Sequence, residues 1–385
     1  MKHLSKQLGA GFAVMMLVIV GMIALPHDRY IRWQAVKTEA FARLGWIYER
    51  VHFDETPIDI AFIGTSHTLN GLDTPLIQRQ LREAGVRLKD GQCPHLVNLA
   101  VPSYGRDLHW LIARELLENK PVKHLVVEVF ENETRQAHAL YAHVAEVEDF
   151  WEAPILINMK YFPNWARLPY RQLLLGMKSL SPSMFGLKKE FDFSDYDGSD
   201  VDNTRLVNVG GQALSPLRDR VMDKALLLKI SKQNADKKDL HMLGAWATRF
   251  EYAVPHHYLG KILNLADKKG VPVTFLYLPQ FGMPPRPFEE DIYVGRGDWL
   301  YVNDLLQNTD YWFDEAHLNA AGAQAISQRV AADLRKKIEA DSAAFSRDGS
   351  LSVMPRGGHS SCQSTVHPAR LTIRPFLKPL AQGRH

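Results

Sequence analysis

The stretch Ile58-Asp59-Ile60-Ala61-Phe62-Ile63-Gly64 decides the fold of this chain. Its apolar side chains form a compact run that ends at a glycine, which is typical of a strand buried on both faces of a parallel sheet. Further short apolar runs occur at His95–Val101, Lys123–Phe130 and Val271–Leu278. The sequence therefore predicts at least these strands in one sheet.

Segments with helical periodicity separate these strands. They lie at Thr74–Ala84, Arg106–Glu118, Tyr258–Lys269 and Ala320–Lys337. Strands that alternate with helices of this length predict βαβ units, and hence a parallel sheet with helices on both faces, as in flavodoxin-like α/β folds. Ligands of such folds bind at the carboxyl ends of the strands. We therefore expect the functional residues in the loops that follow the strands.

The N-terminus carries an apolar segment long enough to cross a bilayer. Basic residues precede an uncharged run from Leu8 to Leu25, which Pro26 ends. At 1.5 Å per residue the run spans about 27 Å, against about 30 Å for a bilayer core. A cleaved signal peptide is the alternative, although its apolar region is usually shorter, at about 7–15 residues. The sequence favours a single-pass membrane anchor over residues 1–26, with the rest of the chain extracytoplasmic, in the periplasm.

The remaining chain divides by composition. Residues 27–57 are a stalk or linker, in which apolar residues at helical spacing from Ile31 to Val51 predict one helix. Residues 58–341 form the α/β domain, and from about 134 to 254 a mostly helical insertion interrupts the alternation of strands and helices. Residues 342–385 are rich in Ser, Arg, Pro, Gly and His without periodicity, which predicts a disordered basic tail.

Charge and composition exclude several classes of function. The formal net charge is +3, and the tail from Ser342 has six Lys or Arg and one Asp, a net +5, which leaves a net −2 for the rest. A slightly acidic body is a poor nucleic-acid binder. Cys93 and Cys362 are the two cysteines, too few for a zinc site on their own. Phosphate-loop and dinucleotide motifs are also absent, so the sequence predicts no metal and no cofactor.

Two motifs at the expected edge of the sheet carry the chemistry. Gly64-Thr65-Ser66 follows the first strand, and Asp314 precedes His317 by three positions, just before the last helix. A parallel sheet places both loops at one edge, where Ser66 can act as nucleophile, His317 as base and Asp314 as the group that orients the imidazole. Each motif alone has a structural alternative, because Ser, Thr and Asp are also favoured helix caps.

A third motif, Asn98–Gly105, follows the second strand. Gly105 can bring a backbone N–H to a developing oxyanion, and the amide of Ser66 can do so at a helix start. One such donor typically contributes about 3 kcal/mol to transition-state stabilisation. A simple turn glycine is the alternative for Gly105.

Taken together, these motifs resemble the SGNH/GDSL hydrolase superfamily, from about Ile58 to Lys337. With its N-terminal membrane segment, the chain is similar to the extracytoplasmic members that acylate bacterial polysaccharides and cell-wall polymers. The resemblance implies an SGNH-like fold with Ser66, Asp314 and His317 as the catalytic triad. It also implies that the amides of Ser66 and Gly105 are oxyanion donors.

The chain departs from the family pattern in two places. Gly64–Ser66 (GTS) stands for the usual Gly-Asp-Ser, and Glu128–Asn132 (EVFEN) stands where Gly-x-Asn-Asp is usual. In this alignment Asn132 is the candidate third oxyanion donor. Alternatively, Asn132-Glu133-Thr134 is a glycosylation sequon, which has meaning only in a eukaryotic secreted protein.

We therefore expect a serine esterase or O-acyltransferase that forms an acyl-enzyme on Ser66 and modifies an extracytoplasmic glycan. Transfer of the acyl group to water would make it an esterase, and transfer to a sugar hydroxyl an O-acetyltransferase or related enzyme. A transferase would need an acyl donor delivered across the membrane, and hence a membrane acyltransferase as partner. The alternative is a non-catalytic, membrane-tethered binding or assembly protein on an inactive scaffold, which the missing Gly-x-Asn-Asp favours.

Overall fold

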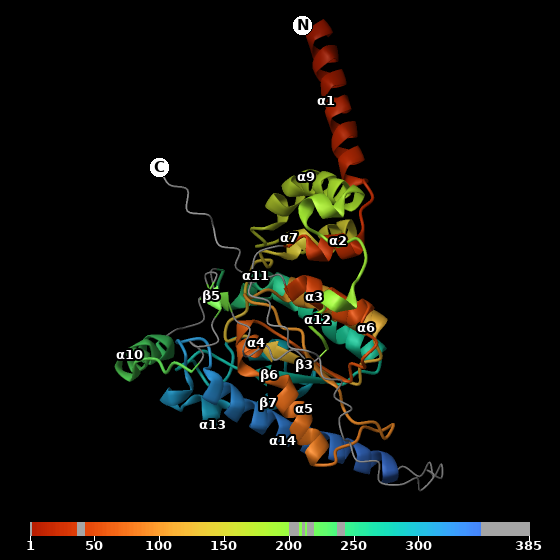
Figure 1. The fold of residues 1–385 in the computed structure, drawn as a ribbon. Helices are drawn as coiled ribbons and strands as arrows, with labels where there is room; N and C mark the ends of the chain where they lie inside the picture. Colours follow the sequence, from red (N-terminus) through yellow and green to blue (C-terminus); the bar gives the residue numbers. More distant parts are fainter. Residues whose placement is uncertain are drawn as a thin grey trace, which may run out of the picture.

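A five-stranded parallel sheet forms the centre of the protein (Figure 1). The computed structural model describes residues 2–36, 43–199, 208–209, 212–213, 219–236 and 243–347. The strands are β1 (Ile60–Ile63), β2 (Leu96–Asn98), β3 (His124–Val129), β6 (Val273–Tyr277) and β7 (Asp298–Tyr301). Their order is β2-β1-β3-β6-β7, and every neighbouring pair is parallel. This is the 2-1-3-4-5 order of doubly wound sheets, so the predicted α/β class with a parallel sheet is confirmed.

Helices cover both faces of this sheet. One face carries α3 (Arg43–His52), α6 (Arg106–Asn119) and α12 (Ala253–Lys268), and the other carries α5 (Thr74–Glu83) and α14 (Ala320–Arg347). Successive side chains of a strand point to opposite faces. Ala61 and Ile63 of β1 therefore enter one apolar core, and Ile60 and Phe62 enter the other. Burial on both faces explains why β1 has no polar side chain.

The structure differs from the sequence prediction at the edge strand β7. Its sequence DWLY is short, and Leu300 is its one buried residue. A strand that is half exposed at a sheet edge lacks the continuous apolar run by which the other strands are recognised. Short α13 (Asn303–Leu306) and the 3₁₀ helices η5 (Glu290–Ile292) and η6 (Thr309–Tyr311) flank β7 along the chain.

The N-terminal helix α1 (Lys2–Ile23) projects away from the domain (Figure 1). Its segment Ser5–Ile23 is the one stretch of the described chain that is long and apolar enough to cross a membrane, and none of it is buried. A membrane anchor and a signal sequence both have this length and composition.

The stalk predicted for residues 27–57 does not stand apart from the domain. In place of one helix from Ile31 to Val51, the described residues form α2 (Arg29–Gln34) and α3, and residues 37–42 lie outside the description. Trp33 of α2 and Ile47 of α3 are buried in the same core as the central strands. The apolar face of this segment was predicted correctly, but it packs against the sheet layer.

The insertion is mostly helical in the part that the structure describes, as predicted. It contains α7 (Tyr141–Val144), α8 (Val147–Glu152), α9 (Tyr161–Leu180), α10 (Lys224–Ala235) and α11 (Thr248–Glu251), with short 3₁₀ helices η1 (Pro182–Phe185), η2 (Phe193–Asp195) and η4 (Ala245–Ala247). A two-stranded antiparallel ribbon, β4 (Asn208–Val209) and β5 (Gln212–Ala213), was not predicted. At the C-terminus α14 continues to Arg347, beyond the predicted Lys337. The rest of the predicted disordered tail, residues 348–385, lies outside the described residues.

Candidate active site

Ser66 lies at the carboxyl edge of the sheet, where the sequence predicted it. β1 ends at Ile63, and α4 (Ser66–Gly71) begins three residues later. Thr65 is the N-cap of α4, and its hydroxyl accepts a hydrogen bond of 3.2 Å from the amide of His67. The capping alternative is therefore correct for Thr65, which leaves the hydroxyl of Ser66 available for another contact.

That contact is with His317, which reaches Ser66 from a loop some 250 positions away. Nε2 of His317 lies 2.8 Å from Oγ of Ser66. The loop is a tight turn between η6 and α14, in which Trp312 and Leu318 form an antiparallel bridge. The amide of Phe313 donates to the carbonyl of His317 at 2.9 Å and closes the turn. The turn thus aims the imidazole at the start of α4.

Asp314 completes the arrangement from the same turn. Its Oδ2 and Oδ1 lie 2.9 and 3.0 Å from Nδ1 of His317. Oδ1 also accepts the amides of Ala316 at 2.8 Å and of His317 at 2.7 Å. The alternative that Asp314 caps α14 is not supported, because Asn319 holds that position and accepts the amide of Gly322 at 2.9 Å.

The Asp314 carboxylate fixes which nitrogen of His317 can act as a base. Burial acts to raise the pKa of Asp314, but the hydrogen bonds and charge of His317, with the two turn amides, hold this pKa below its ordinary value. The ionised carboxylate accepts the N–H on Nδ1 and leaves Nε2 free to take the proton of Ser66. The side chains of His317 and Asp314 are 29% and 34% exposed, so the site opens to solvent.

Glu128 is a central residue of this site to which the sequence reasoning gave no role. It lies on β3 and is only 1% exposed, yet it carries a carboxylate. Oε2 accepts the amides of Thr65 at 2.7 Å and Thr68 at 3.1 Å and the hydroxyl of Thr68 at 2.5 Å, while Oε1 accepts the hydroxyl of Thr65 at 2.6 Å. This carboxylate holds the residues on both sides of Ser66. A buried charge requires such partners, and its place in the strand sequence KHLVVEVF was the available sign.

Gly64 leaves the space that this arrangement needs. A Cβ atom at position 64 would lie 2.3 Å from Oε2 of Glu128 and 2.4 Å from the hydroxyl oxygen of Thr68. No side chain fits there without displacing the carboxylate. The glycine before Thr65-Ser66 therefore allows Glu128 to approach the nucleophile loop.

A second polar group, formed by His67, Tyr104 and Glu131, lies beside the triad. The ring of His67 packs edge-on against the ring of His317, with centroids 5.8 Å apart. Its Nδ1 lies 2.8 Å from the carbonyl oxygen of Leu278, and its Nε2 lies 3.4 Å from the hydroxyl of Tyr104. Tyr104 in turn donates to Glu131 at 3.0 Å. Both ring nitrogens of His67 thus have partners other than Ser66. His67 therefore packs beside His317 and does not take the place of the base.

The oxyanion-donor roles of Ser66, Gly105 and Asn132 stay predictions. Gly105 is buried at the N-cap of α6, in the loop whose Tyr104 reaches His67. A Cβ at this position would lie 2.4 Å from Cβ of His138, which explains the glycine by close packing. Asn132 is exposed, and its Oδ1 accepts a hydrogen bond of 3.5 Å from Tyr252. Its role as a third donor therefore stays a prediction, without a contact to Ser66.

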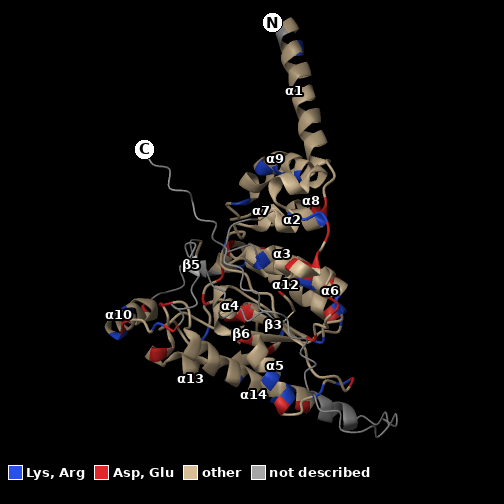
Figure 2. Ribbon diagram, viewed as in Figure 1, with Lys and Arg blue, Asp and Glu red and all other residues tan. Residues whose placement is uncertain are grey.

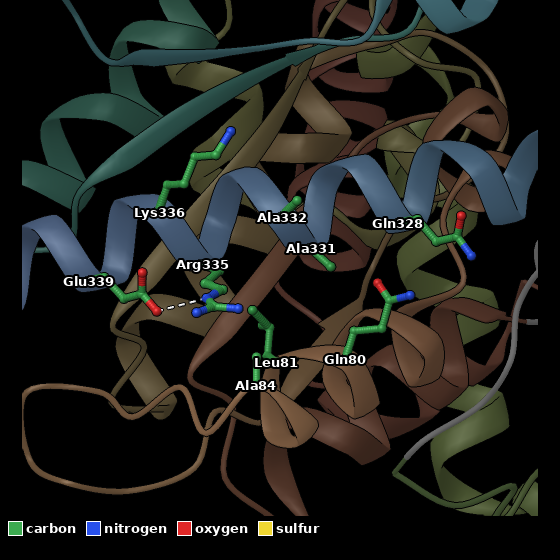
Figure 3. A pocket seen from close by; sticks show the side chains of 9 residues that line it. All are labelled: Gln80, Leu81, Ala84, Gln328, Ala331, Ala332, Arg335, Lys336 and Glu339. Atoms are coloured by element: carbon green, nitrogen blue, oxygen red, sulfur yellow. Dashed lines mark hydrogen bonds and ion pairs between the residues drawn. The ribbon is translucent and has the colours of Figure 1, made fainter.

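A groove of about 460 Å³ lies away from this site, between α5 and α14 (Figure 3). Leu81 and Ala84 of α5 line one wall, and the ion pair of Arg335 and Glu339 on α14 lies along the other. α5 runs back from the carboxyl edge of the sheet, so its last turn lies at the opposite edge. The groove contains none of the triad residues.

The fold and the site together define a parallel α/β protein with a serine, a histidine and an aspartate in hydrogen-bonded sequence at the carboxyl edge of the sheet. Such a constellation can activate the serine hydroxyl as a nucleophile. No protein-family model matches this sequence, and a search of curated proteins found no match.

Proposed function

We propose that this chain is a serine acyl-ester enzyme of the SGNH type. The observation that carries the proposal is the 2.8 Å contact between Oγ of Ser66 and Nε2 of His317, with Nδ1 of His317 held by Asp314 at 2.9 Å. The three residues come from two distant segments and meet in the geometry of nucleophile, base and orienting group. A helix cap or a packed histidine does not require that convergence.

The proposed reaction proceeds through an acyl-enzyme. His317 takes the proton of Ser66 on Nε2 as the hydroxyl oxygen attacks an ester carbonyl. The tetrahedral intermediate collapses when the protonated imidazole gives that proton to the leaving alkoxide, which departs as an alcohol. In the second half, an acceptor hydroxyl attacks the acyl-serine, His317 takes its proton, and Ser66 is released with that proton.

The acceptor decides between an O-acyl esterase and an O-acyltransferase. We propose a glycan outside the cytoplasm as the substrate class, because α1 can serve as a membrane anchor and the resemblance is to enzymes of extracytoplasmic polymers. Exposure of about a third of the Asp314 side chain supports a site that a polymer can approach from solvent. A membrane acyltransferase that supplies the acyl group is the partner expected for the transferase.

The decisive experiment is labelling of the full chain with a fluorophosphonate probe, beside release of acetate from p-nitrophenyl acetate. We expect wild type to react, and Ser66→Ala and His317→Ala to lose both activities while they remain folded. Ser183→Ala is the matched control, because this exposed serine of the insertion belongs neither to the triad nor to the contacts of Glu128. A folded wild type that neither labels nor hydrolyses, with and without membranes that contain its natural partners, would count against the enzyme and favour a binding or assembly protein.

A second experiment separates esterase from transferase. Wild type is given an acyl-ester donor with and without an oligosaccharide acceptor, and free acid and acylated sugar are both measured. A transferase yields acylated sugar at the expense of free acid. If free acid is the only product and the acceptor does not change its rate of formation, the transferase is excluded and the esterase is supported.

A further inference from the structure

An exposed apolar surface lies on the insertion, far from the triad in sequence. We call it the α9 surface and define it by six residues: Trp151, Met159, Phe162, Tyr170, Met177 and Leu180. Each is between 51% and 86% exposed. Phe162, Tyr170, Met177 and Leu180 recur at helical spacing along one side of α9. Soluble proteins rarely leave so many large apolar side chains together in water.

The opposite side of α9 is already packed against the domain. Leu168 and Leu175 are buried in it, at 0% and 3% exposure. α9 is therefore apolar on two sides, whereas the outer side of a soluble helix is normally polar. The exposed apolar side of α9 is therefore suited to contact with an apolar partner.

Five of the six residues of this surface lie in a stretch of chain whose charges are all positive. Between Glu152 and Glu190 the chain has six Lys or Arg and no Asp or Glu. Figure 2 shows the basic residues on α9, where Arg167 is exposed and Lys178 is half-buried, whereas Arg171 is buried against the domain. Apolar and aromatic side chains framed by lysine and arginine are the pattern of a helix that lies in the interface of an anionic membrane.

The position of α9 relative to α1 is consistent with this pattern. The two helices pack together where α1 ends, at the foot of α1 in Figure 1. Gln172 of α9 donates to the carbonyl of Ile23 at 3.1 Å, and Ser179 accepts the amide of Asp28 at 2.9 Å. The plane in which the apolar run of α1 ends therefore passes along α9.

We propose that the α9 surface lies in the headgroup region of the bilayer that α1 enters, with its apolar side chains reaching the acyl chains and its basic residues contacting anionic lipid headgroups. The proposal rests on insertion of α1, which belongs to the proposed function. It gives the insertion a role: two contacts, one spanning and one lateral, fix the orientation of the domain on the membrane. A single helix alone would leave the domain free to rotate.

Photo-cross-linking to lipid tests this surface in the full chain. The photoreactive amino acid p-benzoylphenylalanine replaces Phe162 or Leu180, and the protein is reconstituted in vesicles of three parts phosphatidylcholine to one part phosphatidylglycerol. Leu17 of α1, 72% exposed, serves as the positive control for insertion, and Val294, 63% exposed and outside the insertion, as the matched negative control. We expect lipid adducts at positions 162 and 180 within about threefold of the yield at 17, and at least tenfold above that at 294.

Several results would overturn the proposal, and they can be told apart. Lipid adducts at position 17, together with yields at positions 162 and 180 no higher than at 294, would reject the membrane contact of the α9 surface. The same result would still support insertion of α1. Absence of lipid adducts at all positions would reject both the insertion of α1 and the membrane contact of the α9 surface. Loss of fluorophosphonate labelling alone would count only against the proposed enzyme activity. Adducts to protein instead of lipid, in vesicles or in native membranes, would assign the surface to a second copy or to a partner.

The basic residues of this surface allow a second, independent test of the membrane contact. Combined Lys160→Glu, Arg167→Glu and Lys178→Glu should lower the lipid adducts at position 162 at least threefold and leave those at position 17 unchanged. Removal of phosphatidylglycerol from the vesicles should act in the same direction. Yields that respond to neither change would refute the part of the proposal that assigns the lysines and arginines to anionic headgroups.

Discussion

Removal of the Glu128 carboxylate tests whether its hydrogen bonds to Thr65 and Thr68 fix the position of Ser66. In Glu128→Ala the amides of Thr65 and Thr68, which the carboxylate accepts at 2.7 and 3.1 Å, lose their partner in a buried place. An unpaired buried donor costs about 1–3 kcal/mol, so two amides predict a loss of about 2–6 kcal/mol, and the cavity adds to it. Glu128→Gln keeps an acceptor oxygen for both amides. Its loss of stability should therefore be less than half of the loss in Glu128→Ala.

The measurements are the urea midpoint of the full chain in detergent and the rate of fluorophosphonate labelling. We expect Glu128→Ala to slow labelling at least a hundredfold, because Ser66 loses its fixed position between Thr65 and Thr68, and Glu128→Gln to slow it less than tenfold. Asp149→Ala is the control for instability alone. It removes another buried carboxylate, on α8 of the insertion, which pairs with Arg114 of α6 at 2.6 Å. It should lower stability by a similar amount without slowing labelling.

Two results would contradict this reasoning. The first is a Glu128→Ala protein within about 1 kcal/mol of wild type, since the two amides would then have found other partners. The second is a loss of labelling in Asp149→Ala equal to that in Glu128→Ala, which would trace the effect to general instability.

Three further predictions concern other residues of the site and its support. Asp314→Asn should slow labelling by about 10²–10⁴-fold without unfolding the protein, because the amide no longer fixes the proton on Nδ1 of His317; a loss below tenfold would argue against the orienting role. Gly105→Ala should destabilise the protein by about 1–3 kcal/mol in urea unfolding, because its Cβ would lie 2.4 Å from Cβ of His138; Gly260→Ala, with open space around it and a helical backbone, is the control, and equal losses would contradict the packing argument. Burial raises the pKa of Asp107 to about 7, above an ordinary value near 3.9, so the folded protein holds a proton there that the unfolded chain releases. The stability that Asp107 contributes is therefore present at low pH and is lost as the pH rises to about 7, and the wild-type stability minus that of Asp107→Asn should fall by a few kcal/mol between pH 4 and pH 7; a difference that stays flat or rises would refute this sign.

The sheet and the triad were predictable because they depend on local patterns. β1, β2, β3 and β6 are short apolar runs, and the topology of parallel sheets brings Ser66 and His317 to one edge whatever the sequence distance between them. The residues around them were harder to foresee. Glu128 lies in β3 and Glu131 follows it, and only the fold shows that the first holds the loop around Ser66 while the second accepts a hydrogen bond from Tyr104.

The segment after α1 was misread for a related reason. Helical spacing shows that a segment has an apolar face but does not identify the partner of that face. Arg32 of α2 is 1% exposed because it pairs with Glu146 of the insertion, more than a hundred positions away. The sequence alone gives no sign of a partner so far away along the chain. β7 escaped prediction because an edge strand can be short and half polar.

The short connection between α1 and the first buried helix limits how far the domain can travel. Residues 24–28 separate Ile23 from Arg29, and five extended residues span at most about 18 Å. If α1 is inserted in a bilayer, the domain therefore stays close to the membrane surface. For the proposed enzyme, substrates would then have to come to that surface, where confinement to a thin layer raises their local concentration, and a polymer far from the membrane would lie beyond its range.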